Sequence, residues 1–173
     1  RLGLGTMTWG RDTDEHEARE QLTLFADAGG TLVDTAAAYG AGASEEVLGG
    51  LLGSVVARRD LVIATKAGIS RASDGSRSVD TSRRSLLDDL DASLVRLGTD
   101  HVDLWQVHTW STATPLEETL GALDAAVAGV DHYGRVAIRS RALIRHVRDA
   151  VGVQVGDATG RYGAGGTLLA EPA

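Results

Sequence analysis

Short apolar segments alternate with amphipathic segments of helical periodicity four times between residues 2 and 128. The short apolar segments predict strands, and the longer segments, in which apolar residues recur every three or four positions, predict helices. The predicted strands are residues 2–7, 31–36, 61–65 and 102–107. The predicted helices are residues 14–28, a segment that begins at 44, residues 82–97 and a segment that begins at 115. Strands that alternate with helices in this way are typical of an α/β fold, a parallel sheet covered by helices.

Local signals mark the ends of these elements. Asp12 and Glu15 have the spacing of a capping box, which predicts the start of the first helix, and Gly29-Gly30 predicts its end. Ser44 opens the second helix, and the acids that follow it favour the positive end of the helix dipole. Residues 69–81 are polar and contain glycine, so they predict a loop.

Two folds are built on such a sheet, a doubly wound open sheet and a (β/α)8 barrel. The doubly wound dinucleotide fold usually carries a GxGxxG fingerprint after its first strand. Residues 3–8 read Gly-Leu-Gly-Thr-Met-Thr and lack the third glycine. This departure favours a barrel-type fold.

The last 45 residues do not continue the alternation of predicted strands and helices. Residues 129–173 contain eight glycines, and their six arginines exceed their four acids. Residues 133–140 favour a strand and residues 141–150 a short helix, and the remainder is expected to be irregular. We therefore divide the chain into residues 1–128 and an atypical tail, residues 129–173.

Composition excludes several classes of function. The chain has 17 basic and 24 acidic residues, a net charge of −7, and no basic run, which argues against a nucleic-acid-binding protein. It has no cysteine, and hence neither a disulfide framework nor a thiolate metal site. No apolar stretch approaches the roughly 20 residues of a membrane span, and no signal-peptide pattern opens the sequence. We expect a cytoplasmic protein that binds neither nucleic acid nor membranes.

Four titratable side chains fall at or just beyond the ends of consecutive predicted strands. They are Asp34, Tyr39, Lys66 and His108. Each alone has an ordinary structural explanation, such as a turn cap or a core histidine. Together they lie on the edge where parallel β/α folds build their sites, namely the carboxyl ends of the strands. Lys66 is also the only lysine beside sixteen arginines, which suggests a place where a compact ammonium is required.

This set of groups suits the reduction of a carbonyl. A tyrosine hydroxyl is a weak acid with an ordinary pKa of about 10, and a neighbouring lysine cation favours its phenolate. An aspartate keeps the lysine charged and positioned, and a histidine within reach orients the carbonyl oxygen and shares the proton. The hydride has to come from a cofactor, because no side chain supplies one.

Five segments of residues 2–108 extend the pattern. They read Leu-Gly-Leu-Gly-Thr-Met (2–7), Gly-Thr-Leu-Val-Asp-Thr-Ala-Ala-Ala-Tyr-Gly (30–40), Ser-Glu-Glu-Val-Leu-Gly (44–49), Ile-Ala-Thr-Lys (63–66) and Ser-Leu-Val-Arg-Leu-Gly-Thr-Asp-His-Val-Asp-Leu-Trp-Gln-Val-His (93–108). Together they resemble the aldo-keto reductase family, in its bacterial-type branch, over about three quarters of the chain.

The resemblance implies an NADPH-dependent oxidoreductase that reduces an aldehyde or ketone to an alcohol, with NADH as the less expected cofactor. It implies a catalytic tetrad of Asp34, Tyr39, Lys66 and His108, with Tyr39 as the general acid. It further implies cofactor-binding residues Gly5, Thr6, Met7 and Asp34, and substrate-binding residues Trp9 and Trp110. No metal is expected.

The family fold is a (β/α)8 barrel of typically about 250 residues or more. The chain has room for about the first four β-α units, and residues 141–173 show no counterpart of the later strands that bind the rest of the cofactor. Four strands of a barrel leave two open sheet edges, which favour self-association. We therefore expect a truncated form, whose tail is a frameshifted or chimeric end, the end of a gene fragment, or part of a diverged short form.

Two other functions stay open at this level. The chain could be an inactive fragment or a regulatory relative that binds partners. It could also be a metal-dependent barrel hydrolase that uses His101, Asp103 and His108, although residues 101 and 103 of a strand face the side opposite residue 108.

Overall fold

The computed structural model describes residues 2–71 and 76–128. All of them lie in the first of two compact units, Arg1–Ser140. The strand and helix expected in residues 133–150, and the irregular remainder of the tail, lie outside the described residues.

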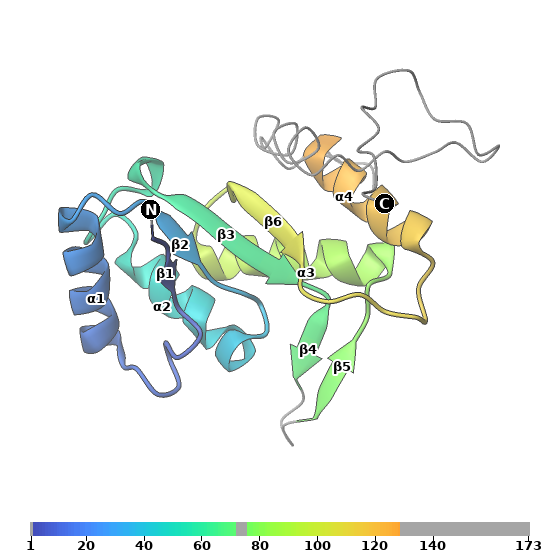
Figure 1. The fold of residues 1–173 in the computed structure, drawn as a ribbon, viewed down its shortest axis with the longest axis horizontal. Coiled ribbons are helices and arrows are strands. Elements are labelled where there is room, and N and C mark those ends of the chain that lie inside the picture. The colour runs from blue at the N-terminus through green and yellow to red at the C-terminus, as the bar shows by residue number, and fades with distance from the viewer. Residues whose placement is uncertain (1, 72–75, 129–173) are drawn as a thin grey trace, which may run out of the picture. The chain divides into compact units, whose positions relative to one another are not determined.

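The alternation of strands and helices produces one parallel sheet. Its strands are β1 (Leu4–Gly5), β2 (Leu32–Asp34), β3 (Val62–Ala67) and β6 (Leu104–Val107). They lie in the order β1-β2-β3-β6, and each neighbouring pair is parallel. Because each strand lies beside the next along the chain in the same direction, their carboxyl ends meet at one edge, as in the first half of a (β/α)8 barrel (Figure 1).

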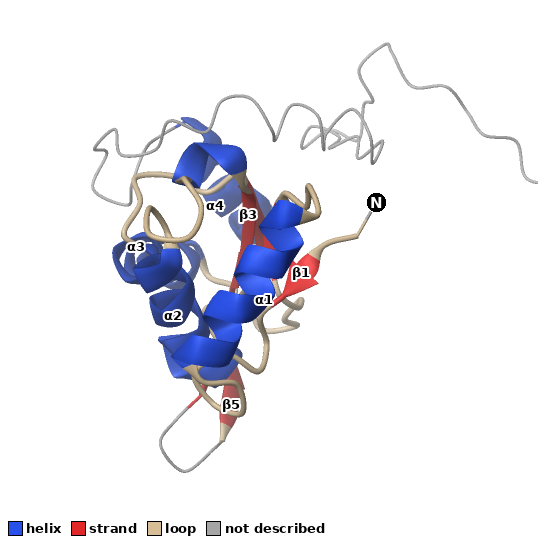
Figure 2. Cartoon of the chain, turned by 90° about the vertical axis from the view of Figure 1, so that its left-hand side faces the viewer, coloured by secondary structure: helices blue, strands red, loops and turns tan. Residues whose placement is uncertain are grey.

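Three helices connect these strands, and a fourth follows β6. They are α1 (Glu15–Asp27), α2 (Ala43–Leu51), α3 (Arg83–Leu97) and α4 (Leu116–Ala128). Each packs on the next one along the chain, and α2 and α3 run behind the strands in the view of Figure 1. Figure 2 shows α1, α2 and α3 beside the strands from a second direction. None of the helices in the described residues is long and apolar enough to cross a membrane.

A largely aliphatic core lies between the sheet and the helices. Its fully buried members include Leu22 of α1, Val33 of β2, Leu48 of α2, Ile63 of β3 and Leu90 of α3. Two indoles, Trp9 and Trp105, complete it. These aliphatic residues lie at the apolar positions from which the strands and helices were predicted, so the pattern that predicts each element also supplies its buried face.

The capping prediction for α1 is wrong in one residue. The side chain of Asp14, not of Asp12, accepts the hydrogen bond of the Glu17 N–H at 2.9 Å. Asp12 instead pairs with the Arg11 guanidinium on the surface. Both acids precede a glutamate by three residues, so the sequence pattern alone did not distinguish them.

The predicted loop of residues 69–81 contains a hairpin. Strands β4 (Ile69–Arg71) and β5 (Arg77–Val79) pair antiparallel, with Ser70 opposite Ser78. These three-residue strands are short and polar, so they carry no apolar alternation. The second helix also ends earlier than its apolar run suggested, at Leu51, because Gly53 turns the chain with φ +80°.

Candidate active site

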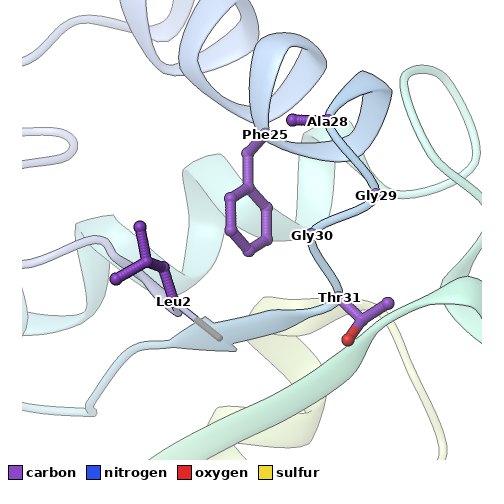
Figure 3. Close-up of a pocket in the computed structure, with 6 residues that line it drawn as sticks. All are labelled: Leu2, Phe25, Ala28, Gly29, Gly30 and Thr31. Carbon is purple, nitrogen blue, oxygen red and sulfur yellow. The ribbon is translucent and has the colours of Figure 1, made fainter.

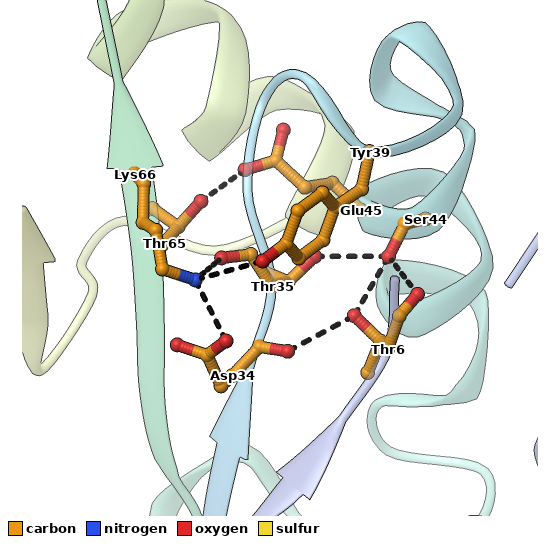
Figure 4. A network of polar contacts seen from close by, with 8 residues as sticks. All are labelled: Thr6, Asp34, Thr35, Tyr39, Ser44, Glu45, Thr65 and Lys66. Atoms are coloured by element: carbon orange, nitrogen blue, oxygen red, sulfur yellow. Dashed lines mark hydrogen bonds and ion pairs between the residues drawn. The ribbon is translucent and has the colours of Figure 1, made fainter. Parts of the chain in front are cut away.

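Lys66 connects three of the four predicted catalytic side chains. Its Nζ donates to Asp34 Oδ2 at 2.7 Å and to the Thr35 carbonyl at 2.9 Å, and it lies 3.3 Å from the Tyr39 hydroxyl (Figure 4). The side chain is 15% exposed, whereas the Asp34 carboxylate is more open to solvent. The ammonium therefore has three oxygen partners, one of them charged, at the carboxyl ends of β2 and β3.

Tyr39 is brought to this edge by an unusual turn. It begins the short 3₁₀ turn η1 (Tyr39–Gly42), whose next residues Gly40, Ala41 and Gly42 have φ of 58°, 54° and 102°. Ala41 is the one non-glycine residue with positive φ in the described segments. A left-handed alanine is uncommon and costs free energy, so the flanking structure has to hold it in place.

His108 completes the tetrad from β6. Its backbone N–H donates to the Ala67 carbonyl of β3, and its ring lies edge-on to the Tyr39 ring, with centroids 5.7 Å apart. Burial lowers the pKa of the imidazole below its ordinary value, and the positive charges of Lys66 and Arg77 lower it further, against the opposing effect of Asp34. Within the described residues, its buried Nδ1 has no hydrogen-bond partner. The lowered pKa favours the neutral form of the ring, and the structure brings all four predicted tetrad residues together.

The first turn of α2 carries a polar cluster that the sequence interpretation missed. Ser44 Oγ donates to the Thr6 carbonyl at 2.8 Å, and the hydroxyls of Thr6 and Thr35 lie 2.7 and 3.0 Å from it. All three side chains are fully buried. Ser44 was interpreted as the opening of a helix, but in the structure it ties the end of β1 to the end of β2 (Figure 4).

The next residue, Glu45, is a fully buried carboxylate. Its Oε1 accepts from Thr65 Oγ1 of β3 at 2.5 Å, and its Oε2 accepts from Arg96 Nε of α3 at 2.7 Å. The interpretation of Glu45 as an acid favoured by the helix dipole missed this. One signal in the sequence could have revealed the cluster: a threonine recurs at the end of each of the first three strands, as Thr6, Thr35 and Thr65.

A close approach of α2 and α3 allows this ion pair. A Cβ built on Gly49, one turn beyond Glu45, would lie 2.3 Å from the Arg96 carbonyl oxygen. A Cβ on Gly42 would lie 2.8 Å from Arg96 Cδ. Both glycines therefore leave the space that Arg96 occupies beside Glu45.

The predicted cofactor-binding residues of the first strand differ in exposure. Gly5 and Met7 are exposed, and a Cβ on Gly5 would meet no atom within 4 Å. Thr6 is fully buried, and its backbone N–H donates to the Asp34 carbonyl. The surface beyond β1 is thus open at Gly5 and Met7, with Thr6 beneath it.

The two predicted substrate-binding tryptophans lie in different surroundings. Trp9 is fully buried in the core, and its indole N–H donates to Gln21 Oε1 at 2.8 Å. Trp110 is 77% exposed. It borders an apolar cavity of about 520 Å³ together with Val107 and the side chains of Leu116, Leu120 and Leu123. The structure therefore brings Trp110, and not Trp9, to an open cavity.

A second cavity lies away from the tetrad. It has a volume of about 570 Å³. Leu2, Phe25, Ala28, Gly29, Gly30 and Thr31 line it (Figure 3). Leu2 and Thr31 precede β1 and β2, so this cavity is at the amino ends of the strands. It contains no titratable side chain.

The alternative metal site has no support in the described segments. Asp103 Oδ2 accepts from Arg58 Nη2 at 2.6 Å and from the Ile63 N–H at 2.8 Å. His101 Nδ1 lies 2.7 Å from the Asp100 carboxylate. Within residues 2–71 and 76–128, no three histidine, aspartate or glutamate side chains are grouped so that they could hold one metal ion.

Comparison with known proteins identifies relatives of the chain. The family model described as "Aldo/keto reductase family" matches residues 1–136. Aldo-keto reductase YhdN of Bacillus subtilis is 37% identical over 124 residues, which are 69% of this chain and 37% of that protein. Aldo-keto reductase yakc of Schizosaccharomyces pombe, whose name carries NADP(+), is 37% identical over 76% of this chain and 39% of its own length.

Solved structures give the same result. The aldo-keto reductase AKR11C1 from Bacillus halodurans, in its holo form, superimposes with a TM-score of 0.67 at 33% identity. The superposition covers 80% of this chain and 43% of that one. The chain therefore spans less than half the length of these three proteins.

Proposed function

The chain belongs to the aldo/keto reductase family, and from this premise we propose that it carries the proton-transfer residues of a reductase that converts an aldehyde or ketone to an alcohol. One observation carries the proposal: Lys66 Nζ lies within hydrogen-bond distance of both the Asp34 carboxylate and the Tyr39 hydroxyl. Family membership supports an oxidoreductase. The assignment of Tyr39 as general acid is ours.

In the proposed reaction Tyr39 gives its hydroxyl proton to the substrate oxygen. Negative charge then develops on the phenol oxygen, 3.3 Å from the Lys66 ammonium. A fixed cation at this distance stabilises that charge, and the Asp34 carboxylate keeps the cation in place.

The neutral imidazole of His108 has a separate task. Its ring lies beside the Tyr39 ring, and a neutral imidazole has one N–H to donate. We propose that it donates to the substrate oxygen and so orients the carbonyl next to the phenol.

The residues at the ends of β1 and β2 fit a nicotinamide cofactor. Gly5 leaves open space, Met7 is exposed, and the Asp34 carboxylate is partly open to solvent. These three residues would hold the flat nicotinamide end, with Thr6 supporting them from below. When bound, the reduced cofactor supplies the hydride to the carbonyl carbon. The name of the yakc relative supports NADPH over NADH. Trp110 and its apolar cavity would contact the substrate.

The substitution Tyr39→Phe tests the assignment in the full 173-residue chain. We expect turnover of a small aldehyde with NADPH to fall at least about 100-fold, because the general acid is removed. NADPH affinity, followed by tryptophan fluorescence, should change little. A Phe variant as fast as the natural sequence would contradict the role of Tyr39, and NADH preferred to NADPH would overturn the cofactor assignment.

A second candidate function is an inactive relative that associates with itself or with a partner. The observation that favours it is the apolar cavity beside β6 and α4, where Leu116 and Trp110 are exposed. Light scattering over a range of concentrations tests it: a mass that rises with concentration, without carbonyl reduction, supports it, and a monomer that turns over substrate excludes it. A cytoplasmic location also remains a proposal from the sequence.

A further inference from the structure

Two consecutive residues of α2, Ser44 and Glu45, are fully buried and polar, although neither touches a substrate-facing group of the tetrad. They lie in the first helical turn after the loop that carries Tyr39. Buried polar groups cost free energy unless they are fully hydrogen-bonded, and buried ion pairs often contribute specificity rather than stability. Their placement therefore calls for a role beyond packing.

Ser44 acts on an acceptor of Lys66. Its Oγ lies 3.0 Å from the Thr35 hydroxyl, and the Thr35 carbonyl accepts a hydrogen bond from Lys66 Nζ at 2.9 Å. Ser44 is also bonded to Thr6 at the end of β1. It thus fixes the residue that supplies one of the three oxygen partners of Lys66.

Glu45 acts on the residue that precedes Lys66. Its Oε1 accepts from Thr65 Oγ1, and consecutive side chains of a strand point to opposite faces of the sheet. Holding Thr65 toward the helices therefore holds Lys66 toward Asp34 and Tyr39. The other carboxylate oxygen is bonded to Arg96, which is itself bonded to Ser93, so the carboxylate has little freedom to move.

The turn between Tyr39 and Ser44 adds a third observation. Gly40, Ala41 and Gly42 all have left-handed backbone conformations. The glycines adopt this conformation freely, but the left-handed Ala41 persists only where the structure on either side fixes it. The bonds of Ser44 and Glu45 to three strands provide that fixation on one side, and so they also determine where Tyr39 stands.

We propose that Ser44 and Glu45 are positioning residues of the active site, which together set the Lys66 ammonium against the Tyr39 hydroxyl and the Asp34 carboxylate. The inference rests on the proposed function in so far as the tetrad is catalytic. The two side chains come from one helical turn and join the ends of β1, β2 and β3 (Figure 4). We call this pair, Ser44 and Glu45, the bracket.

The single lysine of the chain gives a direct test. The full 173-residue chain is treated with acetic anhydride under folding conditions, and acetylation of Lys66 is followed by peptide mass spectrometry, apart from that of the N-terminus. The variants are Thr65→Val, which removes only the hydroxyl, and Glu45→Gln. The matched controls are Thr65→Ser, which restores a hydroxyl, and Glu46→Gln, which changes the exposed neighbouring acid.

We expect Lys66 to react slowly in the natural sequence, because its Nζ is held by three oxygens and is largely buried. Thr65→Val and Glu45→Gln should raise the rate by at least about fivefold, which corresponds to about 1 kcal/mol, the net contribution of one hydrogen bond. Thr65→Ser and Glu46→Gln should react at the natural rate.

Leu22→Ala is the control for a general loosening of the fold, because it leaves a cavity in the core at α1. It lowers stability but should not change the Lys66 rate. If Thr65→Val lowers the melting temperature and leaves the Lys66 rate at the natural value, the bracket is structural only and the inference is wrong. Thr65→Val decides the role of Glu45 even if Glu45→Gln fails to fold. Because acetylation needs no turnover, a chain that reduces no carbonyl would refute the proposed function and leave this result intact.

Discussion

The two sides of the sheet edge differ in how completely their polar groups are bonded. At the ends of β1, β2 and β3, the side chains of Ser44 and Glu45 bond to a threonine of each strand. At the end of β6, the buried Nδ1 of His108 and the buried indole N–H of Trp105 have no hydrogen-bond partner in the described residues. The apolar cavity beside Trp110 lies on this second side.

The difference means that the side-chain hydrogen bonds hold Asp34, Tyr39 and Lys66 of the proposed tetrad more completely than they hold His108. Fully bonded polar networks are rigid, whereas incompletely bonded ones leave groups that need a further partner. The positions of Asp34, Tyr39 and Lys66 follow from contacts within residues 2–71 and 76–128. The position of His108 follows from the hydrogen bond of its backbone N–H to the Ala67 carbonyl and from the edge-on contact of its ring with the Tyr39 ring.

The largest expected effect separates the two tryptophans. Trp9→Ala should lower the free energy of unfolding by about 3–5 kcal/mol, because the indole is fully buried. Trp110→Ala should change it by less than about 0.5 kcal/mol, because the indole is exposed. Urea unfolding followed by circular dichroism measures both. Equal losses of unfolding free energy would contradict the difference in burial between Trp9 and Trp110.

The second effect concerns the approach of α2 to α3. Gly49→Ala should destabilise the protein by about 1–3 kcal/mol, because its Cβ would meet the Arg96 backbone. The adjacent Gly50 faces open space on the same helix, so Gly50→Ala should instead stabilise by about 0.5–1 kcal/mol. The thermal melting of both variants checks the pair, and a Gly49→Ala variant that gains stability would contradict the close packing.

A smaller effect is expected at Asp89 of α3, which accepts the Gly68 N–H at 2.8 Å just beyond β3. Burial raises the pKa of this carboxyl, against the opposing effects of that hydrogen bond and of Arg96. An acid with a raised pKa in the folded state favours folding when protonated, so its contribution is present below the unfolded pKa and is lost as pH rises.

Asp89→Asn should therefore be at least as stable as the natural sequence at neutral pH, and the advantage should shrink toward acid pH. Urea unfolding at several pH values measures this. A variant that is less stable at neutral pH than at acid pH, relative to the natural sequence, would show that the ionised carboxylate is required.

The smallest effect is expected at His108, whose pKa is lowered by burial and by Lys66 and Arg77. For a base with a lowered folded pKa, the unfolded chain binds more protons, so its contribution to stability is present above the unfolded pKa and is lost as pH falls. His108→Gln should remove this loss. The free energy of unfolding should then differ between the two proteins mainly below about pH 6.5, the ordinary histidine pKa. An unchanged pH dependence would mean that the pKa of His108 is the same in the folded and the unfolded chain.

The sequence was sufficient for the sheet and for the placement of the four predicted catalytic side chains at one edge, because both depend on local pattern. Strand and helix periods are written in neighbouring residues, and the carboxyl ends of parallel strands converge in any β/α fold. Hence Asp34, Lys66 and His108 could be placed together before any contact was known.

What could not be predicted depends on partners far along the chain. Glu45 is buried only because Arg96, 51 residues later, reaches it. An exposed helix acid and a buried one look alike in the sequence. The same holds for Trp9, whose burial depends on α1, and for the β4–β5 hairpin, whose polar three-residue strands resemble a loop.

The contact of Arg96 with Gly42 and Gly49 also bears on recombination between relatives. A crossover in the β4–β5 hairpin would take positions 42 and 49 from one parent and position 96 from the other. Gly49 faces the backbone of Arg96 and Leu97, whereas Gly42 faces the Arg96 side chain. Such a chimaera keeps the contact at Gly42 only when one parent carries that glycine and the other carries a side chain at position 96 that fits beside it. Positions 42 and 96 therefore form a single unit of exchange, although about fifty residues separate them.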